Sequence, residues 1–103
     1  GVFVFAPDPD PAAARAYSRM FAPQAGIAED PATGSASGPL GAYLVRHGLV
    51  KATGRVRIVS EQGTRMGRQS FIHIALDARG RDATDIEVGG GVVPVLEGTL
   101  RLP

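Results

Sequence analysis

The residues best suited to chemistry lie in one short stretch, EDPATGSASGPLGAYL, at positions 29–44. A carboxylate, Asp30, is followed after Pro31 by small and hydroxyl-bearing residues, and then by an apolar run with helical spacing. Pro31 keeps Asp30 out of the helical region, and Pro39 is tolerated only within a first helical turn. The sequence therefore predicts a helix over about Ser35 to His47, with the carboxylate just before it.

The start of this helix has the chemistry of an anion site. The backbone amides of its first turn have no acceptor within the helix, and the helix dipole adds positive potential beside them. Small residues keep the approach open, and hydroxyls offer further hydrogen bonds. We predict an anion-binding cradle, with Asp30 at its rim, formed by Thr33, Gly34, Ser35 and Ala36. The alternative is an ordinary helix start, in which Thr33 or Ser35 caps the helix and Asp30 only offsets the dipole.

The elements around the cradle follow from periodicity. Leu40, Tyr43, Leu44 and His47 fall at i, i+3, i+4 and i+7, which predicts one apolar stripe on the helix. Gly48 then supplies the helix stop. Because several period-two segments surround this helix, we expect an α+β fold, with a mostly antiparallel, β-barrel-like sheet curled around one central helix.

The expected strands and turns share short lengths and β-forming residues bounded by Gly, Pro or Asp. Asp10 and Pro11 are expected to begin a short helical turn, as cap and first helical residue. A bulge is expected at Gly89–Gly91. The expected strands are Val2–Phe5 (a buried strand), Tyr17–Phe21, the runs around 55–58 and 71–76, TDIEV (84–88) and two pieces within GGGVVPVLEGTLRLP (89–103), with turns at EQGTRMGRQ (61–69) and DARGRD (77–82).

Composition excludes several functional classes. A chain of 103 residues forms one small domain; its net charge of +1 comes without any basic block, which argues against nucleic acid as a partner. The absence of cysteine excludes disulfides and thiol chemistry, and no apolar run reaches membrane-spanning length. We expect a cytoplasmic protein without a membrane partner. Because the chain opens inside a strand-like segment, GVFVFAP, we also expect it to be a fragment.

Other polar residues are weaker candidates for a site. His47 and His73 lack metal-ligand spacing, so no metal is expected. His73 is predicted to be a partly buried structural histidine, and His47 to favour the helix C-terminus as a cation. Arg65 and Arg68 flank Met66-Gly67 in a turn. For Arg68 we expect a structural role, in a solvated hairpin or paired with an acid, while contact with substrate or another subunit remains the alternative.

Several ordered motifs resemble the phenazine biosynthesis-like (PhzF-like) family, relatives of diaminopimelate epimerase. They are Arg19 with MFAP and AGI, then EDPATGSA, then EQGTRMGRQS, with Gln69 where the family usually has proline, and the closing VGGGVVPVLEGTLRLP. The resemblance runs from about Arg19 to the end and implies that residues 1–103 form the C-terminal domain of a two-domain protein. The active site of such a protein lies in the cleft between its domains, and the family is commonly homodimeric.

The resemblance also implies a function, cofactor-independent isomerisation by proton transfer at carbon. Asp30 would bind substrate and help to steer the proton, while Gly34 and Ser35 would hold a substrate carboxylate. The acid/base glutamate would belong to the N-terminal domain, so we expect little activity from this chain alone, and self-association through apolar surface that the other domain would cover. The rival prediction is a non-catalytic domain that binds a metabolite or a protein partner.

Overall fold

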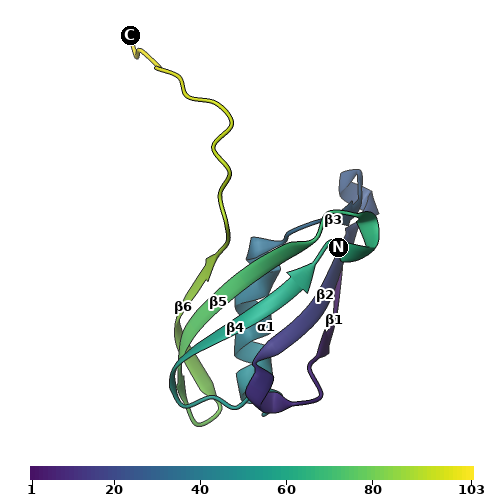
Figure 1. Ribbon diagram of the computed structural model, residues 1–103, viewed down its shortest axis with the longest axis vertical. Coiled ribbons are helices and arrows are strands. Elements are labelled where there is room, and N and C mark those ends of the chain that lie inside the picture. The colour runs from purple at the N-terminus through teal and green to yellow at the C-terminus, as the bar shows by residue number, and fades with distance from the viewer.

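A single α-helix, α1 (Gly34–Arg46), packs on one face of a six-stranded sheet in the computed structural model, which describes residues 1–103 (Figure 1). Short 3₁₀ helices lie in the connections: η1 (Pro11–Ala13), η2 (Pro23–Ala25) and η3 (Thr64–Met66). The strands are β1 (Val2–Pro7), β2 (Arg15–Ala22), β3 (Ile27–Asp30), β4 (Gly54–Gln62), β5 (Ser70–Arg79) and β6 (Asp82–Gly89). The predicted α+β class is confirmed. No helix is long and apolar enough to cross a membrane.

The strand order explains where the helix lies. The sheet runs β1-β2-β4-β5-β6, with β3 paired to β2, and every pairing is antiparallel except that of β2 with β4. Parallel neighbours need a crossover connection, and here the chain between β2 and β4 carries α1 across the face of the sheet. As a result, β4 runs back along the helix and ends beside its first turn.

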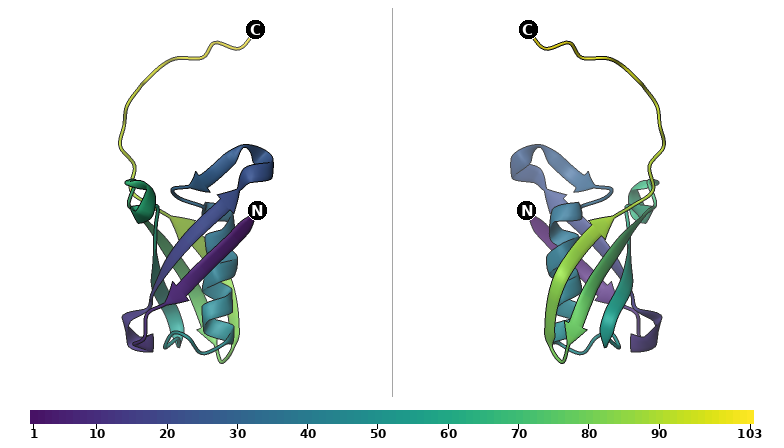
Figure 2. Two further views of the ribbon diagram at one scale, coloured as in Figure 1. Left: turned by 90° about the vertical axis from the view of Figure 1, so that its right-hand side faces the viewer. Right: turned by 90° about the vertical axis from the view of Figure 1, so that its left-hand side faces the viewer.

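The sheet curls around the helix but does not close into the expected barrel. At one edge, the ring of Phe5 in β1 meets that of Tyr43 at 5.4 Å between centroids. At the other edge, Ile86 and Val88 of β6 lie against Gly38. Both edge strands therefore reach the helix (Figure 2), yet β1 and β6 do not pair with each other. The period-two pattern predicts strands, but closure depends on how far their edges are from each other.

The helix buries a different stripe from the predicted one. Leu40 and Leu44 are buried as expected, but Tyr43 and His47 are exposed. The inward face instead includes Gly41, whose missing side chain lets the helix approach the sheet; a Cβ there would lie 2.7 Å from Ile74 Cγ2. The buried hydrophobic core consists of Ala16, Leu40, Leu44, Val45, Val50, Val56, Ile58, Ile74, Leu76 and Ala78.

The N-terminal predictions hold with one correction. The strand expected at Val2–Phe5 exists, but it alternates, so that Phe3 and Phe5 pack toward the core while Val2 and Val4 are exposed. This alternation follows because β1 is an edge strand with one face covered. The strand expected at Tyr17–Phe21 lies within β2. Asp10 caps the predicted turn, with its carboxylate accepting from the Ala12 amide at 2.9 Å.

The prediction for the end of the chain is wrong. TDIEV lies in β6 and DARGRD forms the β5–β6 turn, but β6 ends at Gly89 and residues 90–103 leave the body without regular structure (Figure 1). Nor do Gly89–Gly91 form a bulge, because the register shift lies between Ala75 and Asp77 instead. Consecutive glycines bring no side chain to the core, and Pro94 cannot donate to a strand ladder.

Candidate functional site

The first turn of α1 has free backbone amides. Thr33 occupies the N-cap position, but its side chain makes no capping hydrogen bond. Its hydroxyl donates instead to Asp30 Oδ2 at 2.6 Å. The amides of Gly34, Ser35 and Ala36 make no hydrogen bond, and both Gly34 and Ser35 are exposed. The cap by Thr33 or Ser35 that was the alternative is therefore not formed, and the Asp30 carboxylate lies beside the free amides. That these amides bind an anion stays a prediction.

A residue that the sequence analysis did not single out supports this turn. Gln62, at the end of β4, is fully buried. Its Oε1 accepts from the Thr33 amide at 3.2 Å, and its Nε2 donates to the Asp30 carbonyl at 2.7 Å and to Thr33 Oγ1 at 2.8 Å. No buried side-chain polar atom is left without a partner. Gln62 therefore ties both ends of the loop between Asp30 and Thr33 to the sheet.

The turn after Gln62 packs against the same loop. Gly63 has φ +78°, and a Cβ there would lie 2.8 Å from the Pro31 carbonyl oxygen and would also clash with that of Arg68. The turn closes by the Arg68 amide donating to the Gly63 carbonyl at 2.9 Å. Glu61 belongs to β4 rather than to the turn, and hydrogen bonds from Thr64 and from Gln69 lower its pKa. The ion pair considered for Arg68 is not formed, since its exposed side chain pairs with no acid. A place in a solvated hairpin fits this exposure, and contact with a substrate or another subunit stays a prediction.

The carboxylate next to Asp30 is engaged elsewhere. Arg19, on β2, forms a two-pronged ion pair with Glu29 on β3, with Nε–Oε1 at 2.9 Å and Nη2–Oε2 at 3.0 Å. The hydrogen bonds from Arg19 lower the pKa of Glu29, and those to Glu29 raise the pKa of Arg19. The guanidinium also lies 4.8 Å from the centroid of the Phe21 ring. Asp30, by contrast, forms no ion pair at this end of β3.

A hollow of about 700 Å³ opens beside the cradle. Ala32 and Gly34 form one side of it, and the start of β5 with residues 88–93 forms the other. His73 also lines this hollow, and it is exposed rather than partly buried as predicted. It lies on the outward-facing side of β5, since Ile72 and Ile74 point inward. No group of three or more His, Asp or Glu side chains is placed to hold a metal.

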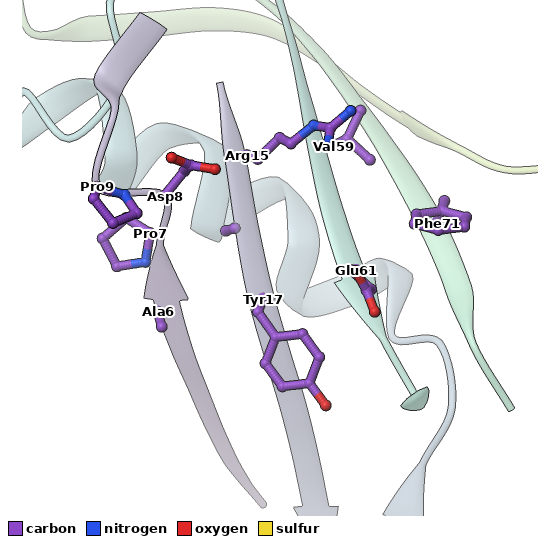
Figure 3. A pocket seen from close by; sticks show the side chains of 10 residues that line it. Ala6, Pro7, Asp8, Pro9, Arg15, Tyr17, Val59, Glu61 and Phe71 are labelled. Carbon is purple, nitrogen blue, oxygen red and sulfur yellow. The ribbon is translucent and has the colours of Figure 1, made fainter. Parts of the chain in front are cut away.

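A second hollow, of about 520 Å³, lies on the sheet face opposite α1. Figure 3 shows Tyr17 on β2, Glu61 on β4 and Phe71 on β5 around it, with Asp8 and Arg15 at one end. None of these side chains hydrogen-bonds to Asp30 or Thr33. The two hollows have Phe71 as a common lining residue, and only the first includes a residue of the predicted cradle, Gly34.

Comparison of the sequence with known proteins identifies its family. Residues 1–98 match the family described as "Phenazine biosynthesis-like protein". The chain belongs to this family. It is 37% identical over 103 residues to an uncharacterized isomerase of Clostridium acetobutylicum, covering 99% of this chain and 34% of that protein. It is 41% identical over 85 residues to the trans-2,3-dihydro-3-hydroxyanthranilate isomerase of Pseudomonas chlororaphis, covering 82% of this chain and 30% of that protein.

A human relative, a phenazine biosynthesis-like domain-containing protein, is 38% identical over 84 residues, which are 82% of this chain and 25% of that protein. The chain spans about a third of the length of the first relatives it matches. The resemblance from the EDPATGSA and EQGTRMGRQS motifs is therefore confirmed at the level of the family, and the relatives whose names state an activity are isomerases.

The structure unites these two motifs, which the sequence analysis treated separately. Asp30, Thr33, Gly34 and Ser35 lie together at the start of α1 as the spacing predicted, with Ala36 in the same turn. The contribution of Gln62 and Gly63 was missed, because their motif was assigned to a solvated turn. One signal was available: a glutamine at an inward-facing position of the alternating run from Val56 is buried, and a buried amide needs partners.

Proposed function

We propose that this chain forms one half of the active site of a cofactor-independent isomerase that moves a proton on a small carboxylate-bearing substrate. The observation that carries the proposal is the open first turn of α1, with free amides beside a carboxylate whose Oδ1 makes no hydrogen bond. The isomerase relatives support it. The substrate class includes compounds like trans-2,3-dihydro-3-hydroxyanthranilate, the compound named for the Pseudomonas chlororaphis relative.

Each residue has a task in this proposal. The amides of Gly34 and Ser35, with the Ser35 hydroxyl, hold the substrate carboxylate at the positive end of the helix dipole. Asp30 accepts a hydrogen bond from a donor group of the substrate and so orients the carbon that loses a proton. A base outside this chain removes that proton and the same group returns it to another carbon, so that the reaction neither gains nor loses atoms.

The acid/base group is proposed to be a glutamate of an N-terminal domain of the same polypeptide, across a cleft. In this proposal the chain is the C-terminal half of a diaminopimelate epimerase-like fold, and the parent protein is a homodimer. The share of the relatives' length that this chain covers, about a third, is consistent with a further domain. Half a cleft leaves water in the site, so the chain alone should turn over little substrate.

The rival function is binding without chemistry. One observation favours it for the chain by itself: Glu29 is held by Arg19, which leaves Asp30 as the single free carboxylate beside the cradle. A proton transfer at carbon needs a positioned base, whereas holding a carboxylate needs only the amides. The two functions therefore differ in what the parent protein contributes.

Solvent deuterium incorporation separates them. The parent-length protein, incubated in D₂O with a panel of small carboxylates that includes trans-2,3-dihydro-3-hydroxyanthranilate, should introduce deuterium at carbon in at least one compound. Asp30→Asn should slow this exchange by roughly 10²-fold or more, in the range of acid–base and positioning effects. Binding of a carboxylate without exchange of any compound would establish the rival function instead.

A further inference from the structure

The hydrogen bonds of Gln62 have a defined direction. Its amide could be placed in two ways, but the Thr33 backbone N–H can only donate and the Asp30 carbonyl can only accept. Oε1 must therefore face the Thr33 amide, and Nε2 the Asp30 carbonyl, as the distances of 3.2 and 2.7 Å show. Because Gln62 is fully buried, water does not compete for either group.

This fixed amide sets the direction of the next hydrogen bond. Nε2 also donates to Thr33 Oγ1 at 2.8 Å, so the hydroxyl oxygen acts as an acceptor there. The single hydroxyl proton of Thr33 is then directed to its other neighbour, Asp30 Oδ2, at 2.6 Å. Asp30 Oδ2 is thereby held as an acceptor, and Oδ1 stays free. We call this directed chain of donors the Gln62–Thr33–Asp30 relay.

We propose that Gln62 is a positioning residue that acts through Thr33 to keep Asp30 as a hydrogen-bond acceptor facing the cradle. The relay makes the site specific for carboxylates that carry an N–H or O–H donor near the carboxylate group, since Oδ1 accepts that donor while the free amides hold the anion. A carboxylate without such a donor would face the unpaired charge of Asp30. This inference rests on the proposed function for the ligand class, but the relay itself is a property of the chain alone.

The relay is tested first without ligand. In NMR spectra of the chain, the Thr33 hydroxyl proton should exchange slowly with water and show a nuclear Overhauser effect to the Asp30 β-protons. Gln62→Met, which keeps the length of the side chain but has no donor, should abolish that contact and speed the exchange. Ser37→Ala is the matched control, because it removes a buried bond to the Thr33 carbonyl (2.7 Å) and leaves the relay intact. A contact absent in the wild type, or retained in Gln62→Met, would overturn the relay.

The specificity is tested with 2-aminobenzoate and benzoate, two carboxylates that differ only by an amino group next to the carboxylate. The wild-type chain should prefer 2-aminobenzoate by about tenfold, the scale of one hydrogen bond to a charged group. Thr33→Val should reduce the preference to about twofold or less, and Thr33→Ser should keep it. The double variant Gln62→Met/Thr33→Val should reduce the preference no further than either single substitution does, because both act through one hydroxyl.

The outcomes are distinguishable. An unchanged preference in Thr33→Val refutes the role of the relay in specificity, while additive losses in the double variant refute action through Thr33. If neither probe binds, the proposed carboxylate site is refuted. The relay is then tested only by the NMR measurement on the Thr33 hydroxyl proton. If Gln62→Met does not fold, the wild-type hydroxyl proton of Thr33 still tests the relay, and the Thr33→Val and Thr33→Ser pair still tests its role in specificity.

Discussion

Two glycines on α1 offer a matched test of the helix–sheet packing that positions the cradle. Both lie inside the helix, where glycine costs about 0.5–1 kcal/mol relative to alanine. A Cβ on Gly38 would lie 3.6 Å from Ile86 Cγ2, an ordinary contact. A Cβ on Gly41 would lie 2.7 Å from Ile74 Cγ2 and 3.1 Å from Leu76 Cδ2. The same substitution therefore gains helix propensity at both positions but overpacks only one.

The balance between helix propensity and overpacking decides whether alanine stabilises or destabilises the chain at each position. Gly38→Ala should stabilise the chain by about 0.5–1 kcal/mol, with a rise in melting temperature of about 4–8 °C per kcal/mol. At Gly41, overpacking a core costs about 1–3 kcal/mol, because the β-branched Ile74 is almost fully buried and cannot swing away. The net effect of Gly41→Ala should be a loss of roughly 0–2 kcal/mol. Thermal and urea unfolding of both variants measure this, and a Gly41→Ala chain as stable as Gly38→Ala would refute the packing argument.

Three further predictions concern the site and the ends of the chain. Ser35→Ala should weaken benzoate binding with little change in melting temperature, whereas a loss of about 1 kcal/mol of stability with unchanged binding would make Ser35 a cap after all. Arg19→Gln should return the pKa of Glu29, measured by carboxyl NMR, to its ordinary value. Because the wild-type pKa is lowered, the stability that the pair contributes is present above about pH 4.3 and is lost as the pH falls through the lowered pKa. The melting-temperature gap between wild type and Arg19→Gln should therefore close in acid, and a constant gap would contradict the pairing. Finally, the chain should self-associate in sedimentation through the exposed residues 92–102, a truncation after Gly91 should reduce this, and equal association of both chains would place the contact elsewhere.

Local signals in the sequence were sufficient for the helix and most strands. Pro31 and Pro39 bracket the start of α1, and Gly48, at φ +65°, ends it. The inward face of the helix could not be predicted in the same way. The spacing of Tyr43 and His47 fits an apolar stripe as well as that of Gly41 and Val45 does. Which of the two faces is buried depends on how closely the helix approaches Ile74.

The wrong strand predictions at the sheet edges have a different cause. Whether a β-forming segment becomes a strand depends on a neighbour with free backbone groups, which no local pattern contains. Val92 to Leu96 have strand composition but pair with nothing here. The candidate site was predictable where it lies within one segment, as Asp30 and Ser35 do. Gln62 joins it from 29 residues beyond Thr33, and that contact follows only from the parallel pairing of β2 with β4.

The support of the Asp30–Thr33 loop bears on how the site would bind. Pro31 restricts its own φ and the conformation of Asp30, Gln62 holds the loop at the Asp30 carbonyl and the Thr33 amide, and Gly63 packs under the Pro31 carbonyl. Because the loop is already held in one conformation, a ligand that binds there would cost little conformational entropy in ordering it. Asp30, however, repels an anion that brings no donor. In the proposed site, tight binding therefore requires a ligand with a carboxylate for the free amides and a donor for Asp30 Oδ1, which the directed hydroxyl of Thr33 leaves free.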